Sequence, residues 1–311
     1  MSNNTLTKNK SGKNGLIELM RFLFALWVLY FHSFVPFKNS YFSDGDLAVE
    51  FFFVLTGFFL ARSMKKYLSM PLRQGLGTFL RHRFKAIAIP FIISEIFVLI
   101  YSLGFDFSYN FLFGYMWYIR DLFIAITVLF ILRKYIKKDL VFYILLAVAS
   151  AAVLALRWPG GGFRAVAFIP IGMLASLIPP IKIKAHGSTD ERKTSLASLS
   201  LFTAVAAYSL YIISKAEKTT AEIYILAVVL YPALLYFASA VNFRSRLLGW
   251  LGSLSFPIYA FQCILRVVEA FGLTDTTYLF IILTVLVLAY SFYEAADKRR
   301  KIKKAAELSR S

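Results

Sequence analysis

Two ionisable residues lie in the first apolar segment of the chain, RFLFALWVLYFHS, which starts at Arg21. Eleven residues span about three helical turns, so a helix places Arg21 and His32 on one face, about 16 Å apart along its axis. Glu18 precedes Arg21 by three residues and can pair with it on that face. Imidazole titrates near neutral pH and guanidinium binds anions, so the segment predicts a general base and an anion-binding group. The alternative is an interfacial histidine and an arginine that extends to the membrane surface.

A carboxylate can complete this candidate base. The second apolar segment, DLAVEFFFVLTGFFLA, carries Glu50 near its start. Two antiparallel helices joined by a short connection would bring Glu50 and His32 to a similar depth. A carboxylate beside an imidazole fixes its tautomer, which is what a general base requires. We therefore expect His32 and Glu50 to be catalytic; a purely structural hydrogen bond between them is the alternative.

Three further segments carry candidate binding residues. The segment FLRHRFKAIAIP places Arg81 and Arg83 where they could clamp a polyanion, although basic residues beside a membrane span are common in any case. Aromatic and charged side chains that could line a cavity occur in MWYIRDLF and in LGSLSFPIYAFQ; structural pairing is the alternative for the first of these. The candidates in these two segments are Trp117, Arg120, Asp121, Tyr259 and Gln262.

Other kinds of site find little support in the sequence. The three histidines do not fall at helical metal-ligand spacing, and the chain has one cysteine, so we expect no metal site. No glycine-rich phosphate loop occurs between a strand and a helix, which argues against nucleotide hydrolysis. The net charge of +18 does not form a continuous patch, so we expect no nucleic-acid partner.

The elements that carry these residues are membrane helices. Hydrophobic residues make up 59% of the 311 residues and charged residues only 17%, and the apolar residues occur in blocks near the length that crosses a bilayer. The sequence therefore predicts an all-α, polytopic integral membrane protein of about ten transmembrane helices. The expected spans are 15–36, 46–63, 84–104, 112–132, 139–157, 163–181, 197–214, 221–242, 253–272 and 276–295.

The basic residues orient these spans. Most of the 35 lysines and arginines fall in the two ends of the chain and in the loops after even-numbered spans. Cytoplasmic loops carry such an excess, so we expect both termini in the cytoplasm. The expected organisation is a tail over 1–14, a membrane domain over 15–295 and a basic tail over 296–311. Five cations are expected on the opposite side: Lys38, Arg157, Arg164, Lys215 and Lys218.

Five of these segments, in this order, resemble the membrane-bound acyltransferase-3 family of O-acyltransferases. The most specific element is the arginine, ten residues and a histidine of the first span. The segments AVEFFFVLTGF, RHR, MWYIRDLF and LGSLSFPIYAFQ are similar to the later motifs. One departure is Gln262, where the family often has histidine; glutamine forms hydrogen bonds but carries no titrating proton near neutral pH.

The resemblance implies transfer of an acyl group, commonly acetyl, from cytoplasmic acyl-CoA to a hydroxyl of an envelope glycan or lipid-linked sugar. Acetyl-CoA or another acyl-CoA would be the donor substrate, with no bound cofactor, and the protein would lie in the bacterial cell membrane. Arg21, Arg81 and Arg83 would face the donor. A transporter or flippase of a glycan or lipid-linked sugar is the alternative, in which the buried charges line a transport path.

Overall fold

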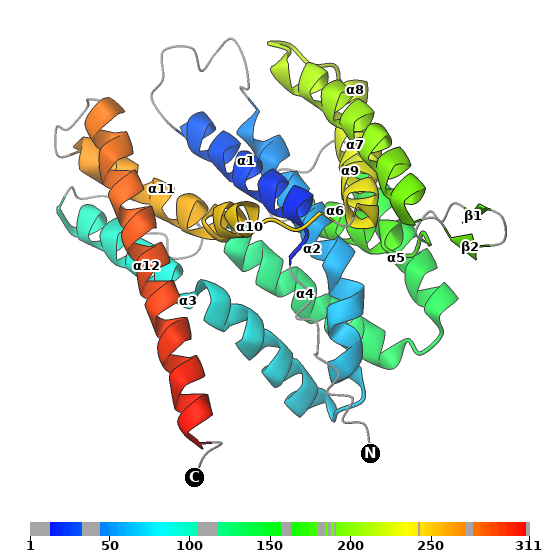
Figure 1. The fold of residues 1–311 in the computed structure, drawn as a ribbon, viewed down its shortest axis with the longest axis horizontal. Coiled ribbons are helices and arrows are strands. Elements are labelled where there is room, and N and C mark those ends of the chain that lie inside the picture. Colours follow the sequence, from blue (N-terminus) through cyan, green and yellow to red (C-terminus); the bar gives the residue numbers. More distant parts are fainter. Residues whose placement is uncertain are drawn as a thin grey trace.

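The computed structural model describes residues 13–32, 44–104, 117–156, 163–179, 184–185, 188–189, 191–241, 243–270 and 276–308. Helices dominate these residues, as expected from the sequence (Figure 1). Two strands of two residues each, β1 (Lys184–Ala185) and β2 (Ser188–Thr189), pair antiparallel between the expected spans 163–181 and 197–214. The helices of the first half are α1 (Gly15–His32), α2 (Gly45–Leu68), α3 (Leu72–Gly104), α4 (Trp117–Tyr135), α5 (Asp139–Ala155) and α6 (Phe163–Ala175).

The second half of the chain is divided more finely than the sequence predicts. The expected span 221–242 is one continuous run of α8, a π-helical turn (η1) and α9, and a separate short helix, α10, precedes α11, which corresponds to the expected span 253–272. The basic segment expected as a tail continues α12 as far as Leu308. The helices are α7 (Glu191–Ser214), α8 (Thr220–Tyr224), η1 (Ile225–Leu230), α9 (Tyr231–Ala240), α10 (Arg246–Ser253), α11 (Ser255–Ala270) and α12 (Thr276–Leu308).

Two prolines explain the irregular helices of this half. Pro232, in the first turn of α9, has no N–H for the carbonyl of Val228, and the backbone immediately before it widens into a π-turn. Pro257 lies in the first turn of α11, where an N–H would have no intrahelical partner. The chain can therefore turn between α10 and α11 without losing a helical hydrogen bond at the proline.

Helix α2 lies at the centre of the bundle and contacts α1, α3, α4, α6 and α9 (Figure 1). Apart from Glu50 and Thr56, its segment AVEFFFVLTGFFLA is apolar around the whole helix, and a helix of this kind is buried in a protein core or in a membrane. Phe51, Phe53 and Val54 have no exposed surface. Helix α2 therefore determines which side chains of its neighbours meet in the interior.

Buried hydroxyl groups link helices that are distant in the sequence. Ser94 Oγ donates to the carbonyl of Ala260 at 2.7 Å, and Ser150 Oγ donates to that of Ala167 at 2.7 Å. The Tyr231 hydroxyl donates to the carbonyl of Leu47 at 3.0 Å and ties α9 to α2. Each of these three hydroxyls thus has a partner, as burial in an apolar interior favours.

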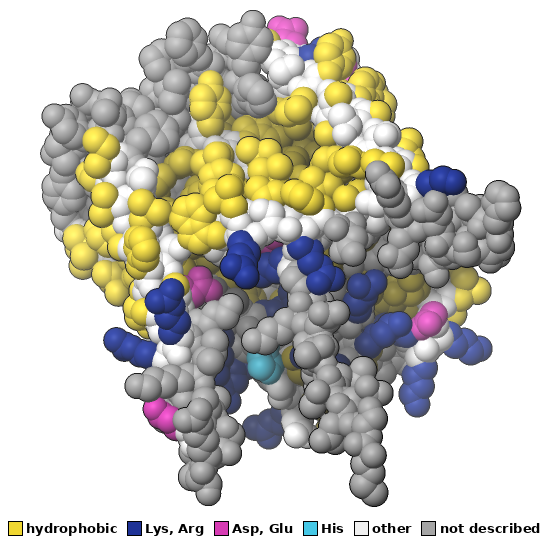
Figure 2. Space-filling view, in the orientation of Figure 1, with side chains coloured by type: hydrophobic (Ala, Val, Ile, Leu, Met, Phe, Trp, Pro, Cys, Tyr) yellow, Lys and Arg dark blue, Asp and Glu magenta, His cyan; other side chains and the backbone are white. Residues whose placement is uncertain are grey.

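The outer surface of the bundle is apolar over a broad band. Large hydrophobic side chains such as Leu103, Val148 and Leu210 are exposed. Figure 2 shows hydrophobic side chains across one part of this face, with lysines and arginines gathered beside them. So much exposed apolar surface is typical of a protein that is surrounded by lipid.

The membrane prediction is supported by helix length and composition. Among the described residues, four helical segments are long and apolar enough to cross a membrane: Gly15–His32, Gly45–Leu68, Lys193–Ser214 and Thr220–Ala240. Within the described part of the chain, every expected span overlaps a helix or a run of helices. Parts of several spans, namely 33–36, 112–116, 157, 180–181, 242 and 271–272, lie outside the described residues. The number of ten spans and the cytoplasmic position of the termini stay predictions.

Candidate functional site

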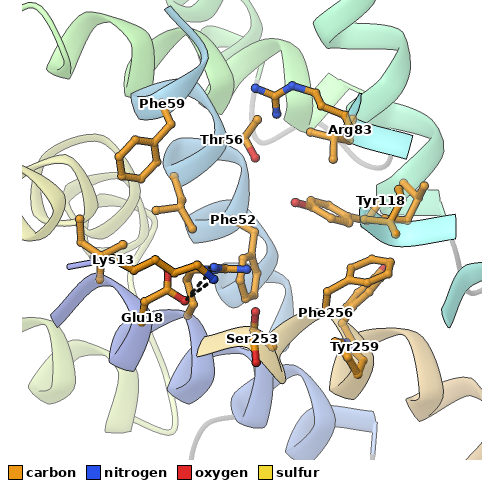
Figure 3. A pocket seen from close by; sticks show the side chains of 18 of the residues that line it. Lys13, Glu18, Phe52, Thr56, Phe59, Arg83, Tyr118, Ser253, Phe256 and Tyr259 are labelled. Atoms are coloured by element: carbon orange, nitrogen blue, oxygen red, sulfur yellow. Dashed lines mark hydrogen bonds and ion pairs between the residues drawn. The ribbon is translucent and has the colours of Figure 1, made fainter. Parts of the chain in front are cut away.

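A cavity of about 810 Å³ lies between α1, α2, α3, α4, α11 and α12. Its lining is cationic and aromatic, with two carboxylates, and Figure 3 shows many of these side chains. Of the residues that we expected to bind substrate, Arg21, Arg83 and Tyr259 line it. The other ionisable lining residues are Lys13, Glu18, Arg62, His82 and Glu294.

Arg21 is held in the cavity wall by Glu18, as the three-residue spacing predicts. Arg21 Nη1 donates to both carboxylate oxygens of Glu18, at 2.9 and 3.1 Å, and Lys13 Nζ lies 3.8 Å from the same carboxylate (Figure 3). Glu18 itself is buried against Gly252 of α10, where a Cβ would collide with the Glu18 backbone and side chain. The missing side chain of Gly252 therefore provides the space for this ion pair.

Arg83 enters the cavity from the opposite wall. Its Nη2 donates to Ser63 Oγ at 2.8 Å, and its guanidinium lies 4.9 Å from the centroid of the Phe79 ring. Arg83 immediately precedes the expected span 84–104. Burial lowers the pKa of its guanidinium, but arginine still carries its charge at neutral pH. A hydrogen bond and an aromatic contact thus fix a permanent cation in place.

Aromatic side chains line the part of the cavity between these cations. The rings of Tyr118 and Tyr259 meet edge to face with centroids 5.3 Å apart, and Phe256 lies 6.3 Å from Tyr259. The Tyr118 hydroxyl points toward Thr56 of α2 (Figure 3). The cavity therefore offers cations for anionic groups and, beside them, an apolar wall with a few hydroxyls.

Glu50 does not line this cavity but lies in a second polar cluster. The side chain is fully buried, and Arg164 Nη1 of α6 lies 3.9 Å from its Oε1. Arg164 Nη2 also donates to Asp46 Oδ2 at 2.8 Å, and its guanidinium lies 5.7 Å from the centroid of the Trp117 ring. Two expected site residues, Glu50 and Trp117, thus meet at Arg164.

His32 ends α1 and is partly buried, with its ring 5.1 Å from that of Phe31. The start of α2 lies beside this end of α1, because a Cβ on Gly45 would collide with Phe31. The two helices are therefore the antiparallel neighbours that we expected. Among the residues that the structure describes, neither carboxylate oxygen of Glu50 has a hydrogen-bond partner, so no hydrogen bond joins Glu50 to His32.

Buried apolar side chains separate Arg21 from His32. Ala25 and Val28, on the face that Arg21 and His32 share, are buried. Phe24, one turn beyond Arg21, stacks on Phe51 with ring centroids 3.8 Å apart. The cavity with Arg21 and the cluster with Glu50 are therefore separate sites in this conformation.

The remaining expected residues lie outside the lining of the cavity. Arg81 is exposed on α3, whereas its neighbour His82 lines the cavity. Arg120 Nε donates to Asp121 Oδ1 at 2.7 Å, so these two residues form the ion pair that the sequence suggested. Gln262 is buried, and its Oε1 has no hydrogen-bond partner.

Sequence reasoning gave no role to Arg164, to Tyr118 or to the cavity residues of α12. Arg164 was expected among the loop cations on the side opposite the cytoplasm, but it is buried in the first turn of α6. The position of Arg164 in the sequence could have indicated a role, since this residue lies within the expected span 163–181 and a cation inside a membrane span is energetically costly. No sequence signal distinguishes Tyr290 or Glu294, which reach the cavity through the position of α12.

The fold and the cavity describe a helical membrane protein with a cationic internal site. The chain belongs to the acyltransferase-3 family, because that family's sequence model, described as an acyltransferase domain, matches residues 14–294. The resemblance seen in the sequence is thereby confirmed, and the protein is a membrane acyltransferase. Comparisons with curated proteins and with solved structures gave no match.

Proposed function

We propose that this acyltransferase moves an acetyl group from cytoplasmic acetyl-CoA to a hydroxyl of a cell-envelope carbohydrate or lipid-linked sugar. The observation that carries this proposal is the cavity of about 810 Å³ with Arg21 and Arg83 in its walls. Such a site suits a ligand that is anionic at one end and carries a small uncharged reactive group at the other. Acetyl-CoA has this character.

The charges of the lining suggest how the donor binds. Phosphate groups prefer arginine, which supplies several donors in a fixed plane, and Arg62, His82 and Arg83 provide positive or proton-donating groups on one side of the cavity. The thioester then lies toward Thr56 and the Tyr118 hydroxyl, which can donate hydrogen bonds to its carbonyl oxygen. Arg81, which is exposed, contributes at most long-range attraction in this arrangement.

In the proposed reaction His32 takes the proton from the acceptor hydroxyl, and the oxygen attacks the thioester carbonyl. The carbon–sulfur bond then breaks, and the thiolate takes that proton to leave as free CoA. Glu50 supports the imidazole. Because Phe24 and Phe51 separate the cavity from His32, direct transfer requires α1 and α2 to part at this layer when the substrates bind.

The first experiment measures the donor and the acceptor together. Envelope glycans from cells with and without the protein are compared by mass spectrometry, with cells that produce His32→Ala protein as the control. We expect a mass increase of one acetyl group that is lost on mild base treatment and absent with His32→Ala. No added acyl mass, together with a changed distribution of a glycan across the membrane, would instead support the transporter alternative.

A further inference from the structure

The carboxylate of Glu50 has an unusual environment for a buried acid. It has no exposed surface, and neither oxygen has a hydrogen-bond partner in the described part of the chain. Burying a charged carboxylate without hydrogen bonds costs roughly several kcal/mol of folding free energy, unless a nearby opposite charge compensates. The orientation of the Glu50 side chain therefore depends on the packing around it and on nearby charges, since no hydrogen bond fixes it.

Arg164 is the cation that faces this carboxylate. Its Nη1 lies 3.9 Å from Glu50 Oε1, which is within ion-pair distance but too long for a hydrogen bond. Its position is fixed on two other sides, by the 2.8 Å hydrogen bond to Asp46 and by the Trp117 ring. Arg164 as a residue is only 8% exposed, so little water screens its charge.

We propose that Arg164 is a positioning residue, which orients the Glu50 carboxylate for its role beside His32 while Asp46 and Trp117 hold the guanidinium. This inference rests on the proposed function, since it assigns Arg164 an effect on acyl transfer through Glu50. Three features distinguish Arg164 from an ordinary structural cation. It directs its two terminal nitrogens toward two acids, it lies on an aromatic ring, and its partner Glu50 accepts no hydrogen bond from the described residues.

The planar guanidinium is necessary for this arrangement. It can point one nitrogen at Asp46 and the other at Glu50 and still present a face to Trp117. A lysine ammonium is a single point charge, so it can approach one acid or lie between both but cannot keep all three contacts. We therefore expect Arg164→Lys to restore only part of the function that Arg164→Gln loses.

The experiment uses membranes that contain the full-length protein, with radiolabelled acetyl-CoA as donor and the acceptor present in those membranes. Initial rates of acetyl incorporation give kcat and the KM for acetyl-CoA of Arg164→Gln, Arg164→Lys, Glu50→Gln and the double variant Glu50→Gln/Arg164→Gln. Lys218→Gln is the matched control, because Lys218 pairs with Asp44, 2.8 Å away, near the same end of α2. Thermal unfolding of each purified variant in detergent monitors the fold.

If Arg164 acts through Glu50, Arg164→Gln lowers kcat about tenfold or more while the KM for acetyl-CoA stays within about twofold. The double variant is then no slower than Glu50→Gln alone, since nothing remains for Arg164 to orient. The double variant also unfolds at a higher temperature than Arg164→Gln, because replacing Glu50 by glutamine removes the buried carboxylate that Arg164→Gln leaves without its cation. Lys218→Gln keeps the rate of the unchanged protein.

Two results separate the failure of this inference from the failure of the proposed function. Normal kcat in Arg164→Gln, or a double variant slowed by the product of the two single effects, would overturn the positioning role alone. Normal kcat in Glu50→Gln would remove Glu50 from the mechanism and Arg164 with it. If Arg164→Gln does not fold, Arg164→Lys and the double variant still decide the question.

Discussion

Gly57 of α2 and Gly172 of α6 lie against each other's helices: a Cβ on Gly57 would collide with the carbonyl of Ile169, and one on Gly172 with that of Val54. The contact between α2 and α6 is the most extensive helix–helix contact of the described residues. Small residues at such a crossing let two backbones approach closely, which is a main source of helix association in membranes. This crossing brings the first turn of α6, with Arg164, beside Glu50 of α2.

Alanine at either crossing glycine should therefore destabilise the protein. We expect Gly57→Ala and Gly172→Ala each to cost about 1–3 kcal/mol, because the backbones must separate to accept a methyl group. Thermal unfolding in detergent measures this effect. Gly77→Ala is the control, since a Cβ there meets no atom within 4 Å, and alanine should stabilise this helix by up to about 1 kcal/mol. Equal stability of all three variants would contradict the close crossing.

Gly252 should control the donor site through the Glu18–Arg21 pair. A methyl group on Gly252 displaces Glu18 and with it Arg21, so Gly252→Ala should weaken acetyl-CoA binding about tenfold, equivalent to about 1.4 kcal/mol. Thermal stabilisation by added acetyl-CoA measures this affinity. Gly249→Ala is the matched control on the same helix, because its Cβ meets nothing within 4 Å. Equal stabilisation of the two variants would separate Gly252 from donor binding.

Arg83 should contribute more to donor binding than any exposed arginine of its helix. Arg83→Gln removes a fixed cation from the cavity wall, and we expect acetyl-CoA affinity to fall about tenfold to a hundredfold. Arg73→Gln, an exposed position on α3, should change it by less than about twofold. Titration of the thermal shift at two salt concentrations measures both effects. If the two variants lose affinity equally, net charge alone attracts the donor.

His32 should be required for transfer but not for donor binding. His32→Ala is expected to lower the rate of acetyl incorporation by about a hundredfold or more, the usual contribution of a general base. Its thermal stabilisation by acetyl-CoA should remain, since His32 does not line the cavity. A folded His32→Ala protein that transfers acetyl at the normal rate would contradict its catalytic role, and loss of donor binding would indicate a structural role.

Much of the architecture could be predicted because membrane helices are encoded locally. Segments such as AVEFFFVLTGFFLA identify helices by length and apolarity alone, and every expected span overlaps helical structure in the described residues. The pairing of Glu18 with Arg21 also follows from spacing within one helix. Helix α10 was not predicted, because it has only 8 residues and is too short to be recognised as a membrane span.

Local sequence patterns were enough to predict the helical class, the resemblance to the family, and the position of each candidate residue along its helix. The neighbour that each residue faces becomes apparent only in the packed bundle, because rotation about a helix axis is set by contacts with distant segments. Val49 lines the cavity, whereas the next residue, Glu50, points away from it toward Arg164, more than a hundred residues later in the chain. The close crossing at Gly57 and Gly172 holds these two helices in contact, and no local pattern specifies that meeting.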